Sequence, residues 1–161
     1  MNNKENDLVT WSDTFSCGIK LIDDQHKELI RLVNEMFMHV TGSEKNELDY
    51  LTKVIEKLVK YVKIHFSTEE KIMRAVKYEG FIEHKKAHDN FIFSIIETVD
   101  EFTTGKRKSL YFFTRFLKDW IFSHIAVMDR GYFRYCRKLA SRKENGRLSI
   151  TNKDIKQAAS A

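Results

Sequence analysis

Residues 65–88 read HFSTEEKIMRAVKYEGFIEHKKAH. His65 and Glu69 lie four residues apart, as do His84 and His88, and this spacing places both members of a pair on one face of a helix. The Tyr-Glu-Gly segment between the pairs interrupts the helical pattern. The stretch therefore predicts two antiparallel helices joined by a short turn, with their polar pairs facing each other.

The apolar periodicity on both sides of this stretch extends the helical pattern to most of the chain. It predicts helices over residues 23–40, 45–77, 82–103, and from 109 past 129. The 161 residues contain no proline and only six glycines, so long uninterrupted helices are favoured. Because short connections join antiparallel neighbours, we expect an all-α protein with an up-down-up-down four-helix bundle.

The two ends of the chain differ from this bundle. The first 22 residues predict an extended N-terminal arm, in which Trp11 and Phe15 can pack on the helices. Residues 130–161 carry nine Lys/Arg and two Asp/Glu, a net charge of +7, whereas the rest of the chain has a net charge of −2. We therefore expect one bundle domain over residues 1–135 and a basic C-terminal extension over 136–161.

Composition also limits the location and the partners of the protein. No apolar run approaches the ~18–20 residues of a membrane span, and the polar N-terminus does not resemble a signal peptide. Cys17 and Cys136 are far apart and are expected to be buried, reduced thiols of a cytoplasmic protein. The nearly neutral bundle argues against nucleic-acid binding, and the basic extension is the predicted site for any protein partner.

Five of the six histidines fall on apolar helix faces together with a glutamate. These residues are His26, His65, Glu69, His84, His88 and His124. Burying so many ionisable groups without partners would cost several kcal/mol for each group. His39 lacks a paired neighbour, and we interpret it as an ordinary hydrogen-bonded histidine. The others call for a shared ligand.

The positions of these groups along the helices support a metal centre. Counted from the turns, residues of all four helices lie within about a helical turn of one level. Imidazoles with carboxylates suit iron, zinc, copper or nickel. They are too many for a single tetrahedral zinc, but suit two octahedral ions with bridging carboxylates. Asp129 is the candidate second bridge. It stands five residues after His124, so we predict a π-bulge between residues 125 and 131.

Taken in order, these motifs resemble the hemerythrin family, in particular its single-domain bacterial members. The resemblance covers about residues 8–135. Its motifs are the Trp11 segment with Gly18, Ile22-Asp23-Asp24-Gln25-His26-Lys27-Glu28-Leu29, His65-Phe66-Ser67-Thr68-Glu69-Glu70, His84-Lys85-Lys86-Ala87-His88, and Trp120-Ile121-Phe122-Ser123-His124-Ile125 with Asp129.

The resemblance implies a non-heme di-iron centre bridged by Glu69, Asp129 and a solvent oxygen. One iron ion would take three histidines, namely His84, His88 and His124. The other would take His26 and His65 and keep one position open for dioxygen. The implied apolar pocket around that position consists of Leu29, Phe66, Trp120, Ile121 and Ile125.

Three functions are compatible with such a centre. The leading hypothesis is reversible dioxygen binding by a carrier, storage or delivery protein, which is not an enzyme. The alternatives are an oxygen- or redox-sensing module that acts through the basic extension, and a di-iron enzyme such as a peroxidase or nitric oxide reductase. Histidines outnumber carboxylates five to two in the predicted site. This ratio stabilises high-valent iron less well and so favours reversible binding.

Overall fold

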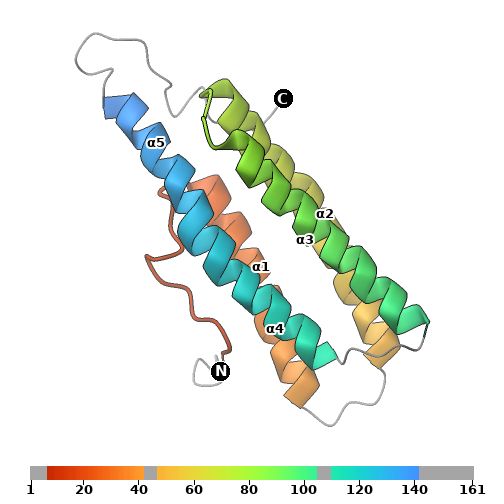
Figure 1. The fold of residues 1–161 in the computed structure, drawn as a ribbon. Coiled ribbons are helices and arrows are strands. Elements are labelled where there is room, and N and C mark those ends of the chain that lie inside the picture. The colour runs from red at the N-terminus through yellow and green to blue at the C-terminus, as the bar shows by residue number, and fades with distance from the viewer. Residues whose placement is uncertain (1–6, 42–46, 105–109, 142–161) are drawn as a thin grey trace.

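Long helices account for almost all of the chain that the structure describes (Figure 1). The computed structural model describes residues 7–41, 47–104 and 110–141. Its elements are α1 (Lys20–Thr41), α2 (Glu47–Ala75), α3 (Phe81–Thr103), α4 (Leu110–Trp120), the π-helical segment η2 (Ile121–Asp129) and α5 (Arg130–Ser141). The last three elements follow one another without a break and form a single rod.

Neighbouring rods run in opposite directions. Helix α1 packs against both α2 and α4, and α2 packs against α3. Figure 1 shows α3 returning along α2 and the rod of α4, η2 and α5 returning along α1. The predicted up-down-up-down four-helix bundle is therefore confirmed.

The interior consists of two apolar clusters with a polar layer between them. The larger cluster includes Leu29, Phe66 and Ile125, and the smaller one includes Ile22 and Ile72. On α1, α2 and the fourth rod, the buried histidines and carboxylates lie in the sequence between residues of these two clusters. The apolar packing on either side thus holds the polar groups of separate helices at one level.

The N-terminal arm is tied to α1 by polar contacts. The Asp23 carboxylate accepts hydrogen bonds from the Cys17 N–H and the Ser16 hydroxyl, each at 2.8 Å. Gly18 has a φ of 80°, a conformation that favours glycine, where the arm turns into α1. Phe15 is buried against the bundle, as predicted. The arm therefore has a defined position beside the polar layer.

The C-terminal rod continues beyond the predicted edge of the bundle domain. Helix α5 runs through residue 135 to Ser141, and Cys136 is buried in the smaller cluster. Residues 142–161, which hold most of the predicted basic extension, lie outside the described residues. The domain division and a partner for the extension therefore stay predictions. None of the described helices is long and apolar enough to cross a membrane.

Candidate metal centre

The fourth rod is wound differently where it meets the polar layer. Segment η2 is a π-helix, in which hydrogen bonds join residues five apart. His124 and Asp129 have that spacing, and both are buried, whereas Val127 between them is 65% exposed. The predicted irregularity is confirmed, although it begins earlier, at Ile121. The π-helix therefore turns both side chains into the bundle.

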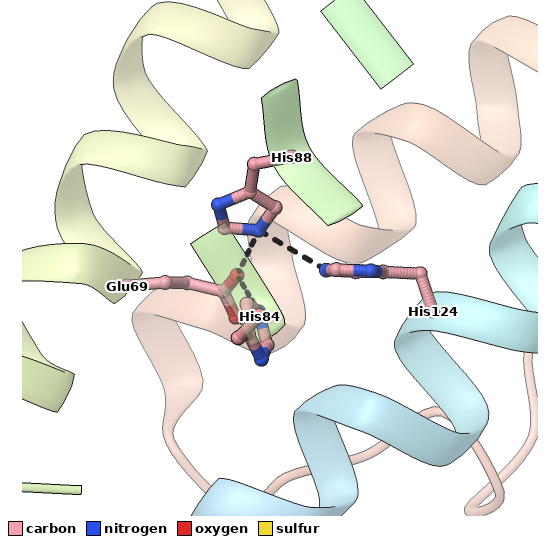
Figure 2. Close-up of side chains that lie close together, drawn as sticks. All are labelled: Glu69, His84, His88 and His124. Atoms are coloured by element: carbon pink, nitrogen blue, oxygen red, sulfur yellow. Dashed lines mark hydrogen bonds and ion pairs between the residues drawn. The ribbon is translucent and has the colours of Figure 1, made fainter. Parts of the chain in front are cut away.

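Seven buried side chains from the four rods meet at this level. They are His26, His65, Glu69, His84, His88, His124 and Asp129, and none is more than 1% exposed. Their ligand atoms form two groups that could each hold a metal ion. One group is Glu69, His84, His88 and His124, drawn in Figure 2, and the other is His26, His65, Glu69 and Asp129. Glu69 belongs to both groups.

The two carboxylates lie between the histidines. Asp129 directs Oδ1 toward Nε2 of His84 and of His124, each at 3.2 Å. Its Oδ2 lies 3.2 Å from Nε2 of His26. The two oxygens of Asp129 thus face different histidine groups.

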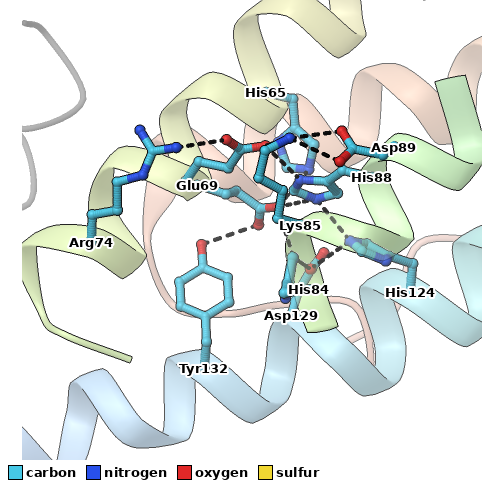
Figure 3. A network of polar contacts seen from close by, with 11 residues as sticks. His65, Glu69, Arg74, His84, Lys85, His88, Asp89, His124, Asp129 and Tyr132 are labelled. Carbon is cyan, nitrogen blue, oxygen red and sulfur yellow. Dashed lines mark hydrogen bonds and ion pairs between the residues drawn. The ribbon is translucent and has the colours of Figure 1, made fainter. Parts of the chain in front are cut away.

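Glu69 divides its contacts differently. Its Oε2 lies 3.5 Å from Nε2 of His65 and 3.3 Å from Nε2 of His88. Its Oε1 accepts a hydrogen bond from the Tyr132 hydroxyl at 3.0 Å (Figure 3). The inner oxygen thus touches both histidine groups, and the outer oxygen anchors the carboxylate.

Three of the histidines have a hydrogen-bond acceptor at their outer nitrogen. Nδ1 of His26 lies 3.3 Å from the Phe15 carbonyl in the arm. Nδ1 of His65 lies 2.9 Å from Oε1 of Gln25, and Nδ1 of His88 lies 3.4 Å from Oε1 of Glu70. An acceptor at Nδ1 keeps the proton on that atom, so the Nε2 lone pair points into the centre as a metal ligand requires.

The buried charges perturb one another strongly in the metal-free chain. Burial alone would raise the pKa of Asp129, but the imidazole of His124 and its neighbours hold it well below its usual range. Burial would lower the pKa of His84, but the carboxylates of Asp129 and Glu69 beside it raise it to about 9. Burial lowers the pKa of His65 to about 3. One histidine is thus driven toward its charged form and another toward its neutral form.

The inner polar atoms fit a bound cation. Nε2 of His26, His65 and His84, Oε2 of Glu69, and both oxygens of Asp129 are buried without a hydrogen-bond partner. Nitrogen and oxygen ligands lie about 2.0–2.2 Å from a transition-metal ion, so adjacent ligands of one ion are about 3 Å apart. The separations of 3.2–3.5 Å between these atoms are close to that value. Metal ions would therefore provide the missing partners.

All five predicted pocket residues are buried in the larger cluster: Leu29, Phe66, Trp120, Ile121 and Ile125. Phe66 stacks on His88 with ring centroids 3.7 Å apart, and Trp120 stacks on His124 at 4.2 Å. These two aromatic rings therefore contact the group of three histidines. His39 is separate from the centre, as expected, and stacks on Tyr50.

Residues 17–136 match the family model of the hemerythrin HHE cation-binding domain. The chain belongs to the hemerythrin family. It is 32% identical to a bacteriohemerythrin of Methylococcus capsulatus over 126 residues, which are 78% of this chain and 94% of the relative. It is 33% identical to a bacteriohemerythrin of Pseudomonas aeruginosa over 129 residues, covering 77% and 78% of the two chains. A solved wild-type hemerythrin is 31% identical to this chain and superposes on it with a TM-score of 0.69. The match covers 79% of this chain and 96% of the solved chain.

Three residues of this hemerythrin centre were missed from the sequence: Gln25, Glu70 and Tyr132. Gln25 and Glu70 stand next to the metal-ligand candidates His26 and Glu69 in the chain. That adjacency was only a partial signal: a residue beside an inward-facing side chain can reach a histidine on another helix, but whether it does depends on how the two helices are rotated relative to each other. Tyr132 follows the π-helix, and its direction could not be predicted without knowing where that segment ends.

Replacing Tyr132 by phenylalanine should lower the free energy of unfolding by about 1–3 kcal/mol, because a buried carboxylate oxygen loses its donor. Guanidinium unfolding of the metal-free protein measures this loss. Tyr135→Phe is the matched control on the same helix, since its hydroxyl makes an exposed bond of 3.4 Å to the Lys77 carbonyl. It should change stability by no more than about 0.5 kcal/mol. Equal effects of the two substitutions would contradict an anchoring role for Tyr132.

Proposed function

We propose that this chain holds two iron ions in the polar layer of the bundle and binds dioxygen there reversibly. The observation that carries the proposal is the pair of buried ligand groups that share Glu69. Each group draws on more than one helix, and many of its inner atoms have no other partner. Ferrous ions in this position would supply the electrons that dioxygen takes up and returns.

The arrangement of ligands is unequal on the two sides. His84, His88 and His124 serve one side, whereas only His26 and His65 serve the other. With Glu69, Asp129 and a solvent oxygen shared between the ions, the first would have six ligands and the second five. The side of His26 and His65 is therefore the proposed position for dioxygen.

The donor set also favours carriage over enzymatic oxidation. Five neutral imidazoles and two carboxylates give two iron ions less negative charge than a carboxylate-rich set does. High-valent iron is then less stabilised, so we propose that the protein is not an enzyme. The surrounding apolar side chains, of which Leu29, Ile121 and Ile125 are at most 1% exposed, exclude water and anions that promote oxidation. A cytoplasmic location remains part of this proposal.

Anaerobic reconstitution with ferrous iron tests the proposal directly. The expected result is two iron atoms per chain, with a visible charge-transfer band that appears in air and disappears when oxygen is removed. Fewer than two atoms per chain would contradict the paired centre. A one-way spectral change with turnover of peroxide or nitric oxide would support an enzyme instead.

Substituting Ile121 by threonine should raise the autoxidation rate about tenfold, because the hydroxyl brings water into the apolar wall. The rate is measured from the decay of the oxygenated spectrum. Ile95→Thr is a matched control, since Ile95 is buried in the same cluster but lies on α3 beyond the histidine pair. If the two variants decay at the same rate, the assignment of Ile121 to the pocket is wrong.

A further inference from the structure

Glu70 places a carboxylate beside a histidine ring nitrogen that faces away from the centre, namely Nδ1 of His88. The outer nitrogens of His26 and His65 face neutral oxygens, a backbone carbonyl and an amide. Nδ1 of His124 is buried without a hydrogen-bond partner. Within residues 7–41, 47–104 and 110–141, Glu70 is the only carboxylate within 4.0 Å of an outward-facing nitrogen of the five histidines.

The position of Glu70 is set by cations on the neighbouring surface. Its Oε2 lies 3.5 Å from the Arg74 guanidinium, and its Oε1 lies 3.9 Å from the Lys85 ammonium. Lys85 also binds Asp89 at 2.7 Å, and Figure 3 shows this pair beside His88. Glu70 lines a groove of about 280 Å³ between α2 and α3, and its side chain is 16% exposed. The carboxylate thus contacts two cations and is partly exposed, while it reaches a fully buried imidazole.

Two contacts together fix the ring of His88. Phe66 lies parallel to it, with an interplanar angle of 2°, and so sets the plane of the ring. Glu70 accepts the Nδ1 proton and so sets the rotation of the ring within that plane. Nε2 then points toward Glu69 and His124, at 3.3 and 3.0 Å.

We propose that Glu70 is a positioning residue that makes His88 the most strongly electron-donating imidazole of the centre and thereby lowers the reduction potential of the bound metal. A carboxylate that accepts an imidazole proton raises the basicity of the other ring nitrogen. A more basic ligand stabilises the ferric state more than the ferrous state. The inference rests on the proposed iron-binding function, and it assigns the strongest donor to the group of three histidines, away from the proposed dioxygen position.

The test compares Glu70→Gln with Asp89→Asn in the full-length chain. Both substitutions remove one negative charge from the same groove. Only the first removes the carboxylate from His88, because Asp89 contacts Lys85. The measurements are the Nδ1 proton resonance of His88 in the zinc-loaded protein, the affinity for cobalt(II), and the midpoint potential of the iron-loaded protein.

Glu70→Gln should move the His88 resonance upfield, weaken cobalt binding about 10–100-fold and shift the potential to more positive values. Asp89→Asn should leave all three unchanged. Equal shifts in both variants would show a general charge effect and overturn the proposal, as would an unchanged Glu70→Gln protein. A wild-type chain that holds a single metal ion would contradict the paired-iron function instead. The role of Glu70 would still be decided by the His88 resonance and the cobalt affinity.

Discussion

Replacing Asp129 by asparagine should weaken iron binding by more than about 100-fold and leave at most one ion per chain. Substituting outer partners of metal ligands already weakens binding 10–100-fold, and Asp129 lies closer to the proposed ions than they do. Its two oxygens face opposite histidine groups, each 3.2 Å from the nearest Nε2 atoms. An amide has one oxygen and no negative charge, so it cannot serve both sides.

The measurement for Asp129 is iron content after anaerobic reconstitution and desalting. Asp119→Asn is the matched control, because Asp119 precedes the π-helix on the same rod and is exposed. Circular dichroism of both variants separates lost binding from lost folding. Full iron occupancy in a folded Asp129→Asn protein would contradict the bridging assignment.

Removing the metal should lower the melting temperature by about 8–16 °C. A ligand present at a thousandfold excess over its dissociation constant stabilises the folded state by about 4.1 kcal/mol. For a chain of 161 residues, 1 kcal/mol corresponds to about 2–4 °C. The metal-free protein must also keep two carboxylates and several imidazole nitrogens buried without their partners. Anaerobic thermal unfolding with and without a chelator measures the difference.

The stability of the metal-free protein should also fall on both sides of about pH 6.5. The pKa of His84 is raised to about 9 from 6.5, so its contribution is complete below pH 6.5 and is lost as the pH rises through 9. The pKa of His65 is lowered to about 3. As the pH falls from 6.5 to 3, the imidazole is therefore protonated in the unfolded chain but not in the folded one, and stability is lost. The lowered pKa of Asp129 adds a further loss at the acid end, below its ordinary value of 3.8.

Bound metal should remove the alkaline part of this dependence, because it replaces the proton on the nitrogen of His84. Unfolding curves between pH 6.5 and 9 should therefore diverge, with the metal-free protein losing stability and the loaded protein keeping it. His84→Gln should flatten the alkaline loss in the metal-free protein. Parallel curves for the loaded and metal-free wild type would contradict this account.

The bundle and the inward-facing histidines and carboxylates could be predicted from the sequence because each depends on local periodicity. His65 with Glu69 and His84 with His88 have the spacing of a single helix face, and counting from the turn between them gives their common height. The π-helix could also be predicted, because His124 and Asp129 cannot share a face of an ordinary α-helix.

The outer contacts could not be predicted in the same way. Whether Glu70 meets His88 or solvent depends on the rotation of α2 relative to α3, which no local pattern determines. Tyr132 and Phe133 follow the π-helix in the basic C-terminal part of the chain, and both are buried. The direction of these side chains depends on a change of helical phase inside η2, which rotates the residues of α5 that follow it.

Because of that change of phase, the number of residues between His124 and Asp129 affects both the candidate metal centre and the packing of α5. Two residues on one face of an α-helix are four apart, whereas His124 and Asp129 are five apart. The additional residue rotates α5 by about 100° relative to a continuous α-helix. Deleting a residue such as Ala126 would restore ordinary winding but would turn Tyr132 and Phe133 away from the small apolar cluster that they complete. The five-residue spacing between His124 and Asp129 is therefore needed for two reasons: it directs both side chains into the bundle, and it sets the packing of α5. A variant that no longer binds metal would therefore still need this residue, because the burial of Tyr132 and Phe133 depends on it.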